Sequence, residues 1–146
     1  MTIWRFAATF FYLGKLPFAP GSWGSLGALA FWLFLPLSYA VHLAVILILF
    51  ILGVYSSNKV AEDMDDHDPS EVVIDEAVGM GISLFMLPHS LGLYILAFIL
   101  FRFFDIFKPS FIYRIQNLPG GWGIMLDDVL AGFFTLAIVT GFLSIL

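Results

Sequence analysis

The acidic residues of this chain are concentrated in three short segments. Of its 11 acids, eight lie between Glu62 and Glu76, one is Asp105, and two are the adjacent Asp127 and Asp128. All three segments border or enter long apolar stretches, and a carboxylate at membrane depth normally faces a partner, a cavity or a metal ion. Oxygen ligands of this kind suit Mg²⁺, which usually keeps some water and binds a substrate phosphate as well. The pattern therefore indicates a hard-cation site and metal-assisted phosphoryl chemistry.

The first acidic segment runs into the start of an apolar stretch. Ser70 follows a proline and is expected to cap a helix, which would place Asp75 and Glu76 about one turn inside the apolar segment. Glu71, Asp75 and Gly79 are spaced four residues apart and are expected to share one helix face, where the glycine leaves room for a close neighbour. Asp75 and Glu76 are therefore candidate catalytic and metal-binding residues.

The second acidic segment also carries basic residues. Arg102, Asp105 and Lys108 are spaced three residues apart, so they are expected to lie adjacent on one helix face before Pro109 disrupts the helix. Asp105 is a candidate metal ligand, and Arg102 and Lys108 could hold phosphate oxygens.

The third acidic segment combines a glycine-rich turn with a helix. Asp127 and Asp128 are expected in the first turns of that helix, and Ala131 and Gly132 follow within about one turn. Small residues at these positions allow a close helix contact. The third segment therefore brings a pair of candidate metal ligands to a helix–helix interface.

The segment 20–27, with the sequence PGSWGSLG, resembles the third segment's glycine-rich turn in outline. Glycine-rich entries to helix N-termini expose backbone N–H groups that suit an anion. We therefore include Ser22 and Ser25 as candidate substrate-binding residues. The alternative is that this segment serves helix packing alone.

The composition is that of a membrane protein. Hydrophobic residues make up 61% of the 146 residues, charged residues only 12%, and the mean hydropathy is +1.00. These values exclude an ordinary soluble domain, while the net charge of −5 without a basic cluster argues against nucleic-acid binding. The absence of cysteine rules out disulfides and thiol chemistry. The length and the lack of linker composition predict one domain over 1–146.

The apolar stretches predict an all-α, polytopic helical membrane protein. Polar or proline-containing breaks near 36–42 and 87–90 divide the first two stretches, so two helical hairpins and a C-terminal transmembrane helix are expected. The N-terminal run Ile3–Leu13 is expected to be an interfacial or short packed helix. The three apolar stretches are Trp23–Tyr55, Val72–Phe104 and Ile124–Leu146.

The distribution of basic residues predicts the orientation. If both hairpins return to their starting side, then the segments 1–22, 56–71 and 102–123 share one face of the membrane, and all six Lys and Arg residues fall in them. The positive-inside rule makes that face cytoplasmic. The candidate site is therefore expected at the cytoplasmic membrane surface.

Four blocks of sequence, in order, make the chain similar to the phosphatidylglycerophosphatase A family. They are PGSWGSLGALAFW, AEDMDDHDPSEVVIDEAVGM, FRFFDIFKP and GGWGIMLDDVLAG, and together they cover nearly the whole chain. The resemblance implies a multi-pass enzyme of the bacterial cytoplasmic (inner) membrane. It implies Mg²⁺-dependent hydrolysis of the terminal phosphomonoester of phosphatidylglycerol phosphate, which releases phosphate and phosphatidylglycerol.

The resemblance also assigns residues. Position by position, it implies metal-site roles for Asp75, Glu76, Asp105, Asp127 and Asp128, and basic positions at Arg102 and Lys108. The chain departs from the family pattern at Pro119, where relatives tend to carry a histidine before the double glycine, so no catalytic role is assigned to the loop 109–119.

Several alternatives remain open at this stage. The acids could be structural caps or paired charges, and a small cation transporter or channel component would also use buried carboxylates. Attack on phosphorus could come from water or from a carboxylate that forms an aspartyl-phosphate. The acids between Glu62 and Asp68 are expected on a solvated face, although His67 and Asp68 lie close enough in sequence to contact a metal or phosphate.

Overall fold

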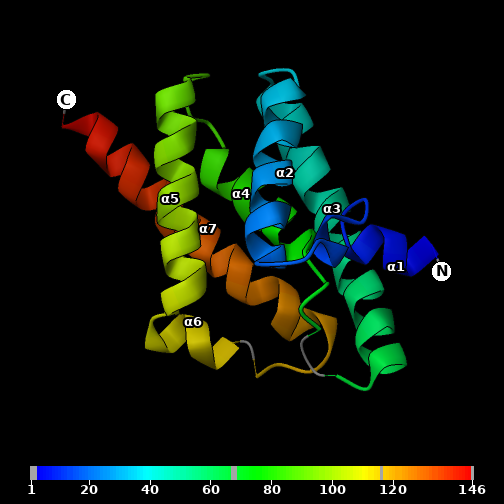
Figure 1. The fold of residues 1–146 in the computed structure, drawn as a ribbon. Coiled ribbons are helices and arrows are strands. Elements are labelled where there is room, and N and C mark those ends of the chain that lie inside the picture. The colour runs from blue at the N-terminus through cyan, green and yellow to red at the C-terminus, as the bar shows by residue number, and fades with distance from the viewer. Residues whose placement is uncertain (1–2, 67–68, 116, 146) are drawn as a thin grey trace.

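The computed structural model describes residues 3–66, 69–115 and 117–145, and Figure 1 shows that this part of the chain is helical. No β-strand occurs among the described residues, so the predicted all-α class is confirmed. The helices are α1 (Ile3–Ala8), α2 (Pro20–Phe34), α3 (Tyr39–Met64), α4 (Ile74–Leu84), α5 (Leu91–Phe107), α6 (Ser110–Ile115) and α7 (Gly121–Ser144), with a 3₁₀ turn η1 at Leu13–Lys15.

The helix breaks fall where proline and serine were expected to place them. Pro20 occupies the first turn of α2, where its fixed φ suits a helix start, and the Ser38 side chain accepts a hydrogen bond from the Val41 N–H to cap α3. The chain reverses at 35–38 and again at 85–90, and both connections lie at the upper end of the molecule in Figure 1. The starts of α2, α4 and α7 and the end of α5 lie below them.

Helix α4 is the centre of the structure. All 11 of its residues are buried, and it packs against α2, α3, α5 and α7. Trp32 of α2 donates a hydrogen bond from Nε1 to the Ala77 carbonyl at 2.9 Å. Helix α2 packs mainly on α4, and it also contacts α3 through the Trp32 and His42 rings, whose centroids lie 5.2 Å apart. The predicted arrangement of two membrane hairpins is not confirmed.

Two glycines bring α4 and α7 into backbone contact. A Cβ added to Gly132 would lie 2.6 Å from the Gly79 carbonyl oxygen, and one added to Gly79 would lie 2.9 Å from the Asp128 carbonyl oxygen. Any larger side chain at either position would push the helices apart. The close contact predicted at Ala131 and Gly132 is confirmed, because Ala131 is also fully buried.

The start of α4 differs from its predicted position. The helix begins at Ile74, so Ser70 is not its cap, Glu71 does not share a helix face with Gly79, and Asp75 lies in the first turn. The physical reason is a tertiary contact with α1: the Val73 N–H donates to the Ala8 carbonyl at 2.9 Å, and Arg5 Nε donates to Glu71 Oε1 at 2.6 Å. The short packed helix expected near the N-terminus is confirmed as α1.

Within the residues that the structure describes, two helices are long and apolar enough to cross a membrane. They are α3, with 26 residues, and α7, with 24. Helices α2 and α5 have 15 and 17 residues, so they are about 22 and 26 Å long at 1.5 Å per residue, a little short for a full crossing.

The glycine contact predicts a difference between two alanine substitutions on the same helix. Gly132→Ala should lower the free energy of unfolding by about 1–3 kcal/mol, because its methyl group would overlap the α4 backbone. Gly141→Ala is the matched control, since a Cβ there meets nothing within 4 Å. Thermal unfolding of both variants, followed by circular dichroism in detergent, compares them. Equal stability of the two variants would contradict the close contact.

Candidate metal and phosphate site

Carboxylates from three helices meet where α4 begins, beside the last turn of α5 and the second turn of α7. One oxygen each from Asp75, Asp127 and Asp128 lies within 4.8 Å of the other two, and the same holds for Glu76, Asp105 and Asp128. Asp75 and Glu76 come from α4, Asp105 from α5, and the remaining pair from α7. The structure therefore brings together all five acids proposed from the sequence.

The position of Asp75 and Glu76 follows from the start of α4. The first N–H groups of a helix have no partner within it, and the positive end of its dipole favours negative side chains. Val73 precedes the helix without providing a side-chain cap, and Asp75 Oδ1 accepts a hydrogen bond from the Glu76 N–H at 3.0 Å. The helix start thus contributes to holding both carboxylates at the site.

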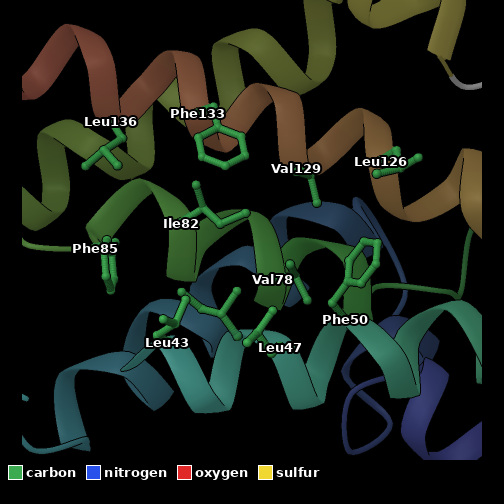
Figure 2. A pocket seen from close by; sticks show the side chains of 11 residues that line it. Leu43, Leu47, Phe50, Val78, Ile82, Phe85, Leu126, Val129, Phe133 and Leu136 are labelled. Atoms are coloured by element: carbon green, nitrogen blue, oxygen red, sulfur yellow. The ribbon is translucent and has the colours of Figure 1, made fainter. Parts of the chain in front are cut away.

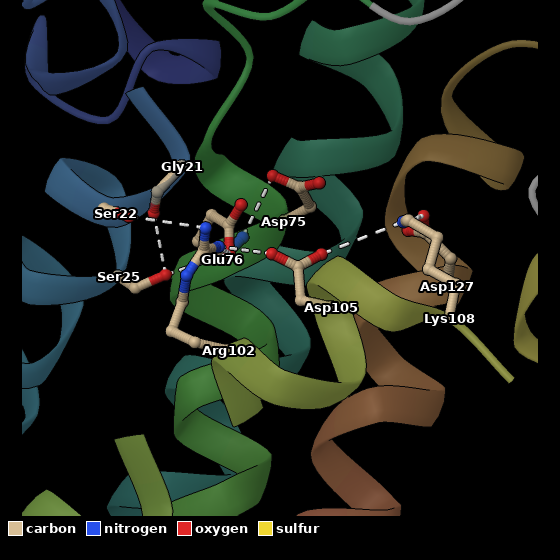
Figure 3. A network of polar contacts seen from close by, with 9 residues as sticks. All are labelled: Gly21, Ser22, Ser25, Asp75, Glu76, Arg102, Asp105, Lys108 and Asp127. Carbon is tan, nitrogen blue, oxygen red and sulfur yellow. Dashed lines mark hydrogen bonds and ion pairs between the residues drawn. The ribbon is translucent and has the colours of Figure 1, made fainter. Parts of the chain in front are cut away.

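Arg102 connects the carboxylates of two helices. Its Nη1 lies 3.4 Å from Glu76 Oε2 and also contacts Asp105 Oδ2, while its Nη2 lies 3.4 Å from Ser22 Oγ. Figure 3 shows the guanidinium between α2, α4 and α5. Arg102 is therefore fixed by contacts to three helices, with its side chain mostly buried.

Lys108 lies on the other side of Asp105. Its Nζ is 2.5 Å from Asp127 Oδ2 and 3.8 Å from Asp105 Oδ1 (Figure 3). Burial by itself lowers the pKa of the Lys108 ammonium, but the carboxylates of Asp127, Asp128 and Asp105 outweigh that effect and raise the pKa well above its usual range. Lys108 is therefore a permanent cation. The predicted alignment of Arg102, Asp105 and Lys108 on one face is confirmed.

The start of α2 covers one side of the site. Ser25 Oγ lies 3.0 Å from Glu76 Oε2 and 2.8 Å from the Gly21 carbonyl oxygen, so its single proton has two acceptors in reach. A Cβ on Gly21 would lie 3.0 Å from Glu76 Oε1 and 3.1 Å from Arg102 Nη1. Gly21 therefore allows the α2 backbone to approach this ion pair.

The backbone of segment 20–27 forms the first two turns of α2. Pro20 starts α2, and the N–H groups of Ser22 and Trp23 both donate to the Ala19 carbonyl, at 2.9 and 3.2 Å. These two N–H groups are thus already engaged, which favours the helix-packing alternative over an anion site on their backbone. The side chains of Ser22 and Ser25 are nevertheless at the site.

Asp128 occupies the middle of the cluster. It is only 1% exposed, belongs to both carboxylate groups, and is placed by the contact of its backbone with Gly79. Its Oδ2 is buried and has no hydrogen-bond partner within the described residues. Because an unsatisfied buried carboxylate oxygen is costly, this atom requires a counter-ion or a proton.

The donor set fits a hard divalent cation. Five carboxylates face two basic side chains, so a formal charge of −3 remains if all are ionised. All the acidic donors are oxygens, which Mg²⁺ and Ca²⁺ prefer, and Asp128 Oδ2 has no other partner within the described part of the chain. The site can therefore hold a metal ion and present two cations to an anion.

The long acidic run lies apart from this cluster. Glu62, Asp63, Asp65 and Asp66 are exposed at the end of α3, as expected for a solvated face. His67 and Asp68 lie outside the described residues. Sequence reasoning missed Gly21 and Trp32, although a tryptophan in an apolar helix signals that its N–H needs an acceptor.

An apolar groove begins beside the carboxylates. It has a volume of about 310 Å³ between α3, α4 and α7 (Figure 2). Val78 follows Asp75 by less than one turn, and Val129 follows Asp128 directly, so the groove adjoins the site. Its lining residues are Leu43, Ile46, Leu47, Phe50, Val78, Ile82, Phe85, Leu126, Val129, Phe133 and Leu136.

Comparisons with known proteins agree on one family. The family model described as phosphatidylglycerophosphatase A matches residues 6–143. The chain is 37% identical to phosphatidylglycerophosphatase A of Escherichia coli K12 over 139 residues, covering 93% of this chain and 81% of that protein. It is 43% identical to phosphatidylglycerophosphatase A of Haemophilus influenzae Rd over 125 residues, covering 83% and 77%.

A third relative carries a different name. The chain is 40% identical to a putative phosphatidylinositol-3-phosphatase of Bacteroides thetaiotaomicron over 141 residues, covering 90% of this chain and 87% of that protein. No solved structure shows a significant match. Because the family model and these relatives span most of the sequence, the chain belongs to the phosphatidylglycerophosphatase A family of phosphatases.

Proposed function

We propose that this chain is a Mg²⁺-dependent membrane phosphatase that hydrolyses the terminal phosphomonoester of phosphatidylglycerol phosphate. The observation that carries the proposal is the convergence of five carboxylates with Arg102 and Lys108. The substrate follows from the names of the E. coli and H. influenzae relatives. The products are phosphatidylglycerol and inorganic phosphate.

The metal would be held by carboxylates drawn from Asp75, Glu76, Asp105, Asp127 and Asp128. When bound, Mg²⁺ supplies charge neutralisation at the phosphoryl oxygens and acidifies a coordinated water. The chain's own cations, Arg102 and Lys108, are already fixed by ion pairs, so they can donate hydrogen bonds to phosphate without first ordering a flexible side chain.

A carboxylate of the cluster takes part in the attack on phosphorus. As a general base it accepts a proton from water as the new P–O bond forms and the bond to the lipid oxygen breaks. As a nucleophile it would form an aspartyl-phosphate that water then hydrolyses. In both cases the departing lipid oxygen takes up a proton and leaves as the free hydroxyl group of phosphatidylglycerol.

The apolar parts of the molecule support a lipid substrate in a membrane. Helices α3 and α7 are long and apolar enough to span the bilayer, and the distribution of basic residues supports a site at the cytoplasmic face of a bacterial inner membrane. With the headgroup phosphate at the carboxylates, an acyl chain would enter the adjoining groove.

Two other functions are compared with this proposal: dephosphorylation of another phospholipid, and cation transport. The relative from B. thetaiotaomicron is named for phosphatidylinositol 3-phosphate, which is also a phosphomonoester on a lipid headgroup. A cation transporter would need ionisable groups with access from both membrane faces, whereas the carboxylates gather in the first turn of α4, the last turn of α5 and about two turns into α7. Family membership and this arrangement favour the phosphatase.

The metal requirement predicts the response to chelation. Purified protein in detergent should release phosphate from phosphatidylglycerol phosphate with Mg²⁺, stop with EDTA, and recover when Mg²⁺ is returned, because the net negative cluster would otherwise repel a phosphate dianion. Phosphatidylinositol 3-phosphate, assayed in parallel, should be the slower substrate. An unchanged rate of phosphate release in EDTA would contradict a role for the metal in the mechanism.

The central position of Asp128 predicts a severe loss of activity on neutralisation. Asp128→Asn should reduce phosphate release at least about 100-fold, because it removes the carboxylate that both acidic groups share. Helicity, measured by circular dichroism, should be retained because the amide has nearly the same size. Asp63→Asn is the matched control, an exposed acid at the end of α3 that should leave turnover unchanged. Wild-type activity in Asp128→Asn would exclude it from the site.

The groove predicts a chain-length effect. Leu47 lines the groove and is half exposed, so Leu47→Trp should fill it and displace the equivalent of one or two methylenes of an acyl chain. At about 0.8 kcal/mol per methylene, KM for a long-chain substrate should rise about 4- to 15-fold. KM for a six-carbon-chain analogue should change little. Ile48→Trp, at an exposed position outside the groove lining, is the control. Equal effects on both substrates would argue against a chain in the groove.

A further inference from the structure

We propose that the site binds two divalent cations, one on each carboxylate group, and that Asp128 is shared between them. The inference deepens the proposed function and rests on it. Its starting point is that the five acids do not form one group: Asp75 and Asp127 combine with Asp128 on one side, and Glu76 and Asp105 combine with Asp128 on the other. Each group offers three oxygen ligands, a number that leaves positions for water and substrate on an octahedral ion.

The state of Asp128 supports a ligand at this junction. It is 1% exposed, and its Oδ2 has no hydrogen-bond partner within the described residues, although Glu76 and Asp127 next to it both contact a basic side chain. Arg102 contacts Glu76 and Lys108 contacts Asp127, on either side of Asp128. The central carboxylate is therefore left for another positive charge. A cation on each side would satisfy the buried Asp128 carboxylate, which forms no ion pair with Arg102 or Lys108.

The charge balance favours two ions over one. With all groups ionised, five carboxylates and two basic side chains leave a charge of −3. One divalent cation would leave the site at −1, which still repels a phosphate dianion. Two divalent cations would bring the site to +1, and a positively charged site attracts a phosphate dianion. Two-metal sites stabilise both the attacking and the leaving oxygen of an in-line displacement, which suits phosphomonoester hydrolysis.

Mn²⁺ binding to the purified full-length protein in detergent tests this proposal without relying on turnover. Loss of the free Mn²⁺ electron paramagnetic resonance signal gives the number of ions bound, and an exchange-coupled spectrum identifies two neighbouring ions. The titration is run with and without inorganic phosphate. The wild type should bind two Mn²⁺ per chain, in at least one of these conditions, and show the coupled spectrum.

Variants assign the two positions. Asp75→Asn and Glu76→Gln should each reduce the count from two ions to one and abolish the coupling, because each belongs to a single group. Asp128→Asn should weaken both ions at least about 10-fold. Asp63→Asn, which removes the same charge from an exposed position, should keep both ions.

The wild-type count decides the matter even if a variant does not fold. A single Mn²⁺ under both conditions would overturn the shared arrangement and leave a one-metal phosphatase intact. If no Mn²⁺ binds to the folded protein, then both this inference and the proposed metal dependence fail, and a proton shared between carboxylates would account for the buried acids.

Discussion

Five carboxylates that meet in a mostly buried volume impose the strongest constraint on this structure. Arg102 and Lys108 offset part of their charge, and each contacts two acids from different helices. The remaining negative charge has to be met by a cation or by protons, because a buried and unpaired carboxylate is costly. The excess negative charge that is costly to bury therefore also favours the binding of a metal ion, and through it a phosphate.

The helix arrangement follows from the need to bring these groups together. Asp75 and Glu76 sit in the first turn of a fully buried helix, and Asp128 reaches them because Gly79 and Gly132 let α4 and α7 touch. Gly21 allows α2 to close over the Glu76–Arg102 pair in the same way. Backbone contacts at small residues thus set the positions of the charged side chains.

The sequence was informative where the signal was local. Breaks at 35–38 and 85–90 followed from proline and serine, and the contacts of Asp105 with Arg102 and Lys108 followed from a spacing of three residues on either side. The predicted start of α4 was wrong because the Val73 N–H donates a hydrogen bond to the carbonyl oxygen of Ala8, more than sixty residues away in the sequence. The packing of α2 on α4 likewise depends on tertiary contacts that no pattern within one helix records.

A crystal structure of the protein grown with Mn²⁺, with diffraction data collected at the manganese absorption edge, tests the central claim most directly. The account predicts anomalous density among the carboxylates of α4, α5 and α7, beside Asp128. Anomalous density confined to the exposed acids at the end of α3, or carboxylates of these helices that face away from one another, would contradict it.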